Sequence, residues 1–244
     1  MMSKNPTGIR LNRYLSLCGV GSRRKCEEMI TDERVAVNGN LVTDLSTYIN
    51  DDDVVTLDGG RITPQRPTYL LLNKPKGVIT TLNDNLQRNH VGMLLPKHVF
   101  LKPVGRLDKN TTGVLLFTND GELHYRLTHP KYEIPRIYLV KLDKIFNEAL
   151  SDKFTRGIQL NRRETAHGKV LDVRHFKKNS ELIVELHEGL NREIHRMFRV
   201  LNYRVLELHR ISYAGIGTGK LRYGQWRYLN QDEIKKIKRL CGII

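Results

Sequence analysis

Residues 103–121 read PVGRLDKNTTGVLLFTNDG and join a charged turn to an apolar run. The run at 114–117 predicts a buried strand, and Asp120 after it is a typical N-cap residue for a following helix. In the turn, Asp108 stands between Arg106 and Lys109. Neighbouring cations favour an ionised carboxylate, which can act as a nucleophile or as a base. An ordinary turn aspartate fits the same pattern, so the stretch alone leaves both interpretations open.

Apolar runs continue along the rest of the chain and alternate with a few helical patterns. Strands are predicted at 69–73, 78–81, 114–117, 136–142, 170–174, 181–187 and 204–212. Helices are predicted at 120–128, 147–156, 191–201 and 231–240, the last of them capped by Asn230. Because several strand runs follow one another directly, we expect an α+β domain built on a mixed, mostly antiparallel sheet.

The N-terminal part of the chain has a pattern of its own. Two short helices are predicted, the second capped by Ser22, and a hairpin should close on Asn38-Gly39. Residues 61–68, RITPQRPT, contain two prolines and few apolar side chains, which is typical of a linker. The predicted domains are therefore a small one at 1–60 and a larger one at 69–244.

The chain carries a net charge of +15 and has a pI of about 9.8. Such a charge indicates an anionic partner, most often a nucleic acid. Acids and bases balance over the first 68 residues, so the remainder holds the whole excess. In the small domain the predicted RNA-phosphate contacts are Arg10, Arg13, Arg23, Arg24 and Lys25. In the larger domain they are Lys74, Lys76, Arg126, Lys131, Arg162, Arg163, Arg199, Arg204 and Arg210.

Most other chemistries lack the residues that they require. The sequence contains no phosphate-binding glycine loop, and its histidines show no metal-ligand spacing. The sequence contains no apolar run of about 18 residues, so no membrane span is predicted. It has no secretory signal, and its three cysteines form no CxxC pair, which together predict a reducing cytoplasm. Residues 108–112, DKNTT, are similar to the motif of aspartyl-phosphate enzymes. However, KPVGRL is a poor strand, and Asn110 replaces the second acid that those enzymes need.

Four segments, in this order, closely resemble the bacterial RsuA/RluB-type pseudouridine synthases, and the RluB-like branch in particular. They are NKPKGVITT (73–81), VGRLDKNTTGVLLFTNDGEL (104–123), THP (128–130) and EGLNREIHRMF (188–198). Residues 9–60 resemble the alpha-L RNA-binding domain of relatives of ribosomal protein S-four. The resemblance implies an isomerase that converts uridines of ribosomal RNA, expected in the large subunit, to pseudouridine. It also implies a flipped-out base, a cytoplasmic monomer, and neither a cofactor nor a metal.

The resemblance also assigns residues to the site. Asp108 matches the essential aspartate of the family, and Arg106 matches the arginine that fills the space left by the flipped nucleotide. Tyr138 matches the tyrosine that stacks on the uracil, and could also be a tyrosine packed within a strand. Leu186 matches an apolar residue beneath the pocket.

The helix motif NREIHRMF departs from the family at one position. Relatives carry Arg or Lys where His195 stands, and that cation pairs with the catalytic aspartate. A histidine can pair with Asp108 only while protonated or as a hydrogen-bond donor, and Arg192 or Arg196 could take its place. This departure keeps an alternative open, a non-catalytic RNA-binding or ribosome-assembly factor with the same fold.

Overall fold

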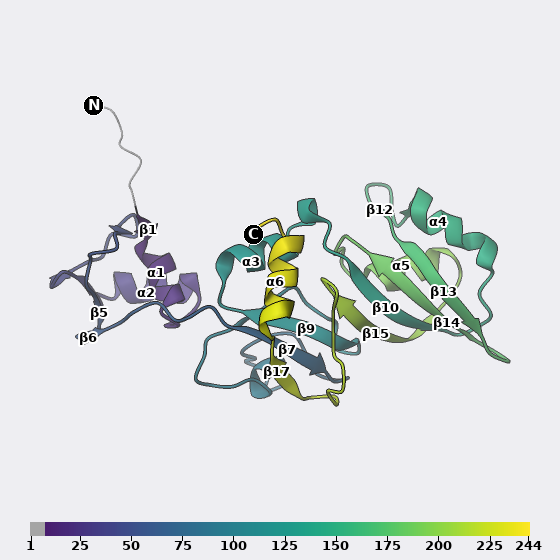
Figure 1. Ribbon diagram of the computed structural model, residues 1–244, viewed down its shortest axis with the longest axis horizontal. Coiled ribbons are helices and arrows are strands. Elements are labelled where there is room, and N and C mark those ends of the chain that lie inside the picture. The colour runs from purple at the N-terminus through teal and green to yellow at the C-terminus, as the bar shows by residue number, and fades with distance from the viewer. Residues whose placement is uncertain (1–7) are drawn as a thin grey trace, which may run out of the picture. The chain divides into compact units, whose positions relative to one another are not determined.

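The computed structural model describes residues 8–244, which form two compact units (Figure 1). The first contains the described residues up to Pro67 together with Pro96–Phe100, and the second contains Thr68–Leu95 and Leu101–Ile244. Within the described chain, no helix is both long and apolar enough to cross a bilayer.

Two short helices and a set of very short strands make up the first unit. They are β1 (Ile9–Arg10), α1 (Leu11–Leu17), α2 (Arg23–Thr31), β2 (Val35–Val37), β3 (Asn40–Leu41), β4 (Tyr48–Ile49), β5 (Val55–Leu57) and β6 (Gly60–Arg61). The Ser22 hydroxyl accepts from the Lys25 amide at 3.2 Å, which confirms the predicted cap. Asn38 and Gly39 both have positive φ, as a tight hairpin turn requires. Ile62, next to β6, packs against the apolar core of this unit.

The second unit contains the remaining elements. They are β7 (Tyr69–Lys74), η1 (Val91–Met93), β8 (Lys102–Pro103), β9 (Thr112–Thr118), α3 (Gly121–Thr128), η2 (Pro130–Tyr132), β10 (Arg136–Leu142), η3 (Glu148–Leu150), α4 (Ser151–Arg156), β11 (Ile158–Gln159), β12 (Thr165–Ala166), β13 (Lys169–His175), β14 (Ser180–Leu186), α5 (Glu193–Val200), β15 (Val205–Tyr213), β16 (Ile216–Gly217), β17 (Trp226–Tyr228) and α6 (Gln231–Leu240). Asp120 and Asn230 cap α3 and α6 as predicted.

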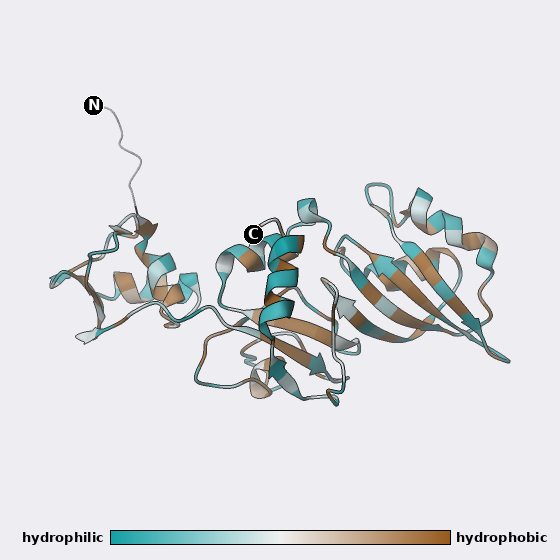
Figure 2. Ribbon diagram, viewed as in Figure 1, coloured by the Kyte–Doolittle hydropathy of each residue, from teal (hydrophilic) through white to brown (hydrophobic). Residues whose placement is uncertain are grey.

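One sheet organises this unit, with strands in the order β13-β14-β10-β15-β9-β7-β17 and with β16 and β8 paired to β15 and β9. β9 and β15 run parallel and every other pair is antiparallel, which confirms the α+β class with a mixed sheet. Figure 2 shows β7 and β9 as largely apolar strands, and all six residues of β7 are buried. α3 and α6 pack on the β7 and β9 half, while α4 and α5 pack on the β10 and β14 half.

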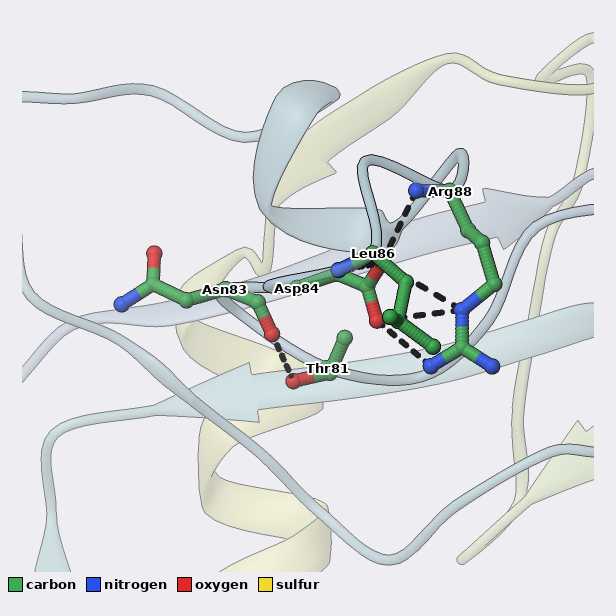
Figure 3. Close-up of polar contacts among 5 residues, drawn as sticks. All are labelled: Thr81, Asn83, Asp84, Leu86 and Arg88. Atoms are coloured by element: carbon green, nitrogen blue, oxygen red, sulfur yellow. Dashed lines mark hydrogen bonds and ion pairs between the residues drawn. The ribbon is translucent and has the colours of Figure 1, made fainter.

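The predicted strand at 78–81 is wrong, because this segment belongs to a loop in which Ile79 forms a single bridge to His90. Polar bonds shape the loop after it (Figure 3). The Asp84 carboxylate accepts from the Leu86 amide at 3.1 Å, from the Arg88 amide at 2.8 Å and from the Arg88 guanidinium at 2.6 Å. These bonds, led by those of the guanidinium, lower the pKa of Asp84 to about 2.

Two predicted helices also differ at their ends. The segment 147–156 divides into η3 and α4, and the helix predicted at 191–201 begins only at Glu193. Arg192 has a φ of 47°, so the backbone enters α5 from a left-handed turn that the helical spacing of the sequence does not reveal.

Candidate active site

Asp108 lies in the loop that joins β8 to β9, and its side chain is exposed. Its carbonyl oxygen accepts from the Thr111 amide at 3.1 Å, which closes a turn around Lys109 and Asn110. Gly105, with a φ of 70°, begins the loop in a conformation that glycine adopts without strain. The loop therefore presents a carboxylate outward from a defined turn.

Lys74 holds this loop from the inside. Its side chain is fully buried, and Nζ lies 2.9–3.3 Å from the carbonyl oxygens of Pro75, Asp108, Lys109 and Thr111. Burial lowers the pKa of Lys74 to about 8, against the opposing effect of the Asp108 carboxylate. An ammonium group has three protons to share among these oxygens. Lys74 is thus a positioning residue for the loop, and its predicted contact with RNA phosphate is wrong.

A second set of bonds holds the loop from the neighbouring segment. The Thr80 hydroxyl donates to the Leu107 carbonyl at 2.7 Å and accepts from the Leu107 amide at 3.2 Å. The Gly77 amide donates to the Lys109 carbonyl at 2.8 Å. The segment NKPKGVIT at 73–80 therefore acts as a brace for the Asp108 loop, which explains why the two motifs occur together.

A cavity of about 410 Å³ opens beside Asp108. It brings together most of the residues that the sequence assigned to the site, namely Arg106, Asp108, Tyr138, Leu186, Arg192 and His195. They come from the loop, from β10, from β14 and from the start of α5. Leu186 is buried and Tyr138 is half-buried, so the cavity has an apolar floor and an aromatic wall.

Arg196 is the predicted pocket residue that does not line this cavity. Its guanidinium forms an ion pair with Glu164 and donates to the Asn191 carbonyl at 3.3 Å. These bonds hold the start of α5 against the β11–β12 hairpin. The Arg196 guanidinium is therefore engaged with Glu164 and not with Asp108.

Two buried arginines lie at the back of the cavity. Arg136 donates to the carbonyls of His187 and Glu188, and its guanidinium carbon lies 5.3 Å from the centre of the Tyr213 ring. Arg210 is 2% exposed, and its Nε donates to the Val114 carbonyl at 2.7 Å. Its Nη2 is buried and has no hydrogen-bond partner within residues 8–244. Burial of Arg210 contradicts its predicted role as an exposed phosphate contact.

Helix α5 adds a carboxyl group and an imidazole. Glu193 is 5% exposed, and burial, reinforced by Glu188, raises its pKa to about 7. His195 is half-buried, and burial together with Arg192 lowers its pKa below 6.5, while Asp108 acts in the opposite direction. At neutral pH the imidazole beside Asp108 is therefore mostly uncharged.

Sequence reasoning missed Arg136, Tyr213 and Glu193 as lining residues. Arg136 stands two residues before Tyr138 on one strand, and residues at that spacing share a face of the sheet. That spacing from Tyr138 could have predicted Arg136 as a lining residue. Tyr213 and Glu193 have no comparable local signal, since their places depend on how β15 and α5 pack.

Comparison with known proteins shows the family of the chain. The family model described as RNA pseudouridylate synthase matches residues 68–199, and the S4 domain model matches residues 9–55. The chain belongs to the RNA pseudouridylate synthase family. As a member of that family it is an RNA-modifying isomerase with an RNA-binding S4 domain in front, which confirms the resemblance seen in the sequence and favours the enzyme over the non-catalytic alternative.

Several relatives match over nearly the whole chain. The chain is 38% identical to "Ribosomal large subunit pseudouridine synthase B" of Bacillus subtilis, over 95% of this chain and 96% of the relative. It is also 38% identical to an "Uncharacterized RNA pseudouridine synthase" of Aquifex aeolicus, over 96% of each. A solved structure titled "Crystal structure of pseudouridylate synthase" is similar with a TM-score of 0.66 and 28% identity, over 94% of this chain and all of that one.

Proposed function

We propose that this enzyme isomerises one or a few uridines of large-subunit ribosomal RNA to pseudouridine, with Asp108 as its catalytic group. The observation that carries the proposal is the exposed Asp108 carboxylate, on a braced loop, at a cavity with an apolar floor and an aromatic wall. The name of the Bacillus subtilis relative supports the choice of RNA. We expect the enzyme to act as a monomer in the cytoplasm.

The reaction breaks the bond between the ribose and nitrogen one of uracil and forms a bond to carbon five. A proton leaves carbon five and a proton is gained at nitrogen one, so the change is an isomerisation without added reactants. An ionised Asp108 can serve by attacking the ribose, by attacking the base, or as a base at the sugar. All three roles need an unprotonated carboxylate.

The uridine must leave its helical stack to reach Asp108, at a cost of a few kcal/mol. Under this proposal Arg106, which is exposed beside Asp108, fills the space that the base leaves. Tyr138 stacks on the flipped uracil and Leu186 packs beneath it. Nη2 of Arg210, which has no hydrogen-bond partner among the described residues, donates to a uracil carbonyl oxygen.

The cation that relatives place beside the aspartate is replaced here by His195. Because this imidazole is mostly neutral at pH 7 and its buried Nδ1 has no hydrogen-bond partner within residues 8–244, we propose that it acts toward Asp108 as a hydrogen-bonding group rather than as a full charge. Arg192 lines the same cavity and supplies positive charge near the carboxylate. Arg196 forms an ion pair with Glu164, so it is not needed to pair with Asp108.

The first unit is proposed to hold the RNA while Asp108 acts. Arg10, Arg13, Arg23 and Arg24 are exposed on its helical half and suit phosphate contacts. Lys25 is also exposed, but its ammonium pairs with Glu28 at 2.9 Å, so it is less available to an RNA phosphate.

Asp108→Asn tests the proposal. The variant should bind an in vitro transcript of the large-subunit RNA as the wild type does and should form no pseudouridine, because the amide is neither a nucleophile nor a base. Asp172→Asn, an exposed acid on β13 outside the cavity, is the matched control and should remain active. Nucleotide-resolution pseudouridine mapping reads the result, and full-rate modification by Asp108→Asn would contradict the mechanism.

A further inference from the structure

A second and larger cavity, of about 1020 Å³, adjoins the first. The two share Asp108, Thr111, Arg192, His195 and Leu208 as lining residues. The proposed reaction uses the smaller cavity for a single uridine and leaves the larger one unexplained. Since the larger cavity begins at the reacting carboxylate, whatever enters it lies next to the isomerised nucleotide.

An exposed aromatic ring forms one wall of this second cavity. Tyr223 lies in the loop before β17 and is 61% exposed. The Asn73 side chain donates to the Leu221 carbonyl at 2.8 Å, and the Gly224 amide donates to the Asn73 carbonyl at 2.8 Å. The backbone on both sides of Tyr223 is therefore tied to β7, so the ring is solvent-exposed on an anchored support.

A second ring stands against Tyr223. The two ring centres of Tyr223 and His209 lie 5.9 Å apart at an interplanar angle of 86°, an edge-to-face arrangement. Nδ1 of His209 lies 2.8 Å from the Thr112 hydroxyl, which orients the imidazole from β9. The Tyr223 side chain stays 61% exposed despite this contact, so a partner can reach it to stack.

The charges around this cavity suit a nucleotide. Lys76 and Lys109 are exposed on the two loops that meet beside Asp108, where a phosphate on the neighbouring nucleotide would pass. At the other end Lys141 pairs with Glu207 at 3.3 Å, close to Glu181. Leu139 and Leu206 supply apolar surface between these two ends. The arrangement offers cations near the reacting carboxylate and an aromatic and apolar surface beyond it.

We propose that this second cavity is a base-stacking subsite for an unpaired RNA nucleotide that adjoins the isomerised uridine. Tyr223 supplies the stacking surface, and Lys76 and Lys109 neutralise the phosphate. Enzymes that act on flipped bases choose substrates partly through the flanking nucleotides, and aromatic side chains accept any base by stacking. The inference rests on the proposed function, since it needs the uridine to occupy the smaller cavity.

Substitution at Tyr223 measures the stacking. Tyr223→Ala should raise KM for the large-subunit transcript roughly 5- to 100-fold, the usual effect of losing one base stack. Tyr223→Phe keeps the ring and should behave as the wild type. The matched control is Phe176→Ala, which removes an aromatic ring that is 49% exposed at the β13–β14 turn and lines neither cavity.

Photocrosslinking locates the contact. With p-benzoylphenylalanine in place of Tyr223, the crosslinked nucleotide should lie within about two positions of the mapped pseudouridine and not on it. Equal KM values for Tyr223→Ala and wild type, or a crosslink far from the pseudouridine, would overturn the subsite while leaving the proposed function intact. A wild-type enzyme that forms no pseudouridine in the transcript would instead overturn the proposed function, and the subsite with it.

Discussion

The Glu193 side chain lowers the stability of the folded state when it is ionised. The carboxyl group is buried at the start of α5, where Oε2 accepts from the Leu190 amide at 3.2 Å. Its Oε1 is buried and has no hydrogen-bond partner in the described part of the chain. An ionised carboxylate with one unsatisfied oxygen is unfavourable in such a place. The raised pKa follows directly from that environment.

Glu193→Gln should therefore stabilise the protein at alkaline pH. The folded pKa of about 7 lies above the ordinary 4.5, so the folded state binds the proton more tightly and stability falls as pH rises from 4.5 to 7. The full cost, on the order of 3 kcal/mol, is present above pH 7. The variant should raise the free energy of unfolding by up to that amount at pH 8 and by little at pH 4, as measured by urea denaturation.

Glu122→Gln is the control for this comparison. Glu122 also lies in the first turn of a helix, α3, but its side chain is exposed and pairs with Arg126. Glu122→Gln should not raise the free energy of unfolding at pH 8. Equal effects of Glu193→Gln at both pH values would mean that the charge of Glu193 is not the source of the cost.

At the scale of elements, the parallel contact between β9 and β15 joins the two halves of the sheet. Only His209 with Thr112 and Arg210 with Gly113 are paired there. Gly113 has a φ of 102°, and a Cβ atom on it would lie 2.2 Å from the Arg210 carbonyl oxygen. This close approach brings the Asp108 loop next to the buried Arg210 side chain. The candidate site therefore depends on a glycine that lines neither cavity.

Gly113→Ala should lower the free energy of unfolding by roughly 2–4 kcal/mol, because it combines a strained φ with a backbone clash. Thermal or urea unfolding measures the loss. Gly121→Ala is the matched control, since a Cβ atom there meets nothing within 4 Å and φ is not positive. If both variants unfold alike, the strands do not need this close approach.

At the scale of the whole molecule, charge governs the encounter with RNA. The net charge of +15 predicts binding that weakens steeply with salt. Arg13 and Arg24 in the first unit are exposed and form no ion pair with any residue from 8 to 244. They are free to contact phosphate, and each such contact adds to the salt dependence.

The double variant Arg13→Gln, Arg24→Gln should reduce the slope of log K against log salt concentration by about 1.4, for two lost phosphate contacts on single-stranded RNA. Filter binding over a range of salt concentrations measures the slope. Lys177→Gln, Lys178→Gln removes the same charge from the exposed β13–β14 turn and should change the slope less. A larger effect of the control pair would place the RNA on the second unit instead.

Features that depend on short-range bonds could be predicted from the sequence. Ser22, Asp120 and Asn230 cap their helices through atoms three residues away, and Asn38-Gly39 turns its hairpin. An apolar run likewise predicted β10 at its full length. Motif order pointed to Asp108 and most of its neighbours through family resemblance, and these residues line one cavity.

Which charged groups are buried, and which way they point, depends on long-range packing that the sequence does not reveal. Lys74 reaches the Thr111 carbonyl 37 residues away, and Arg210 reaches Val114 across 96 residues. Arg196 likewise turns to Glu164, which lies 32 residues earlier in the chain. The free energy of a charged side chain depends on burial and on partners that long-range packing supplies, and composition or spacing cannot express either. The same packing placed Tyr223 beside His209 and opened the second cavity next to Asp108.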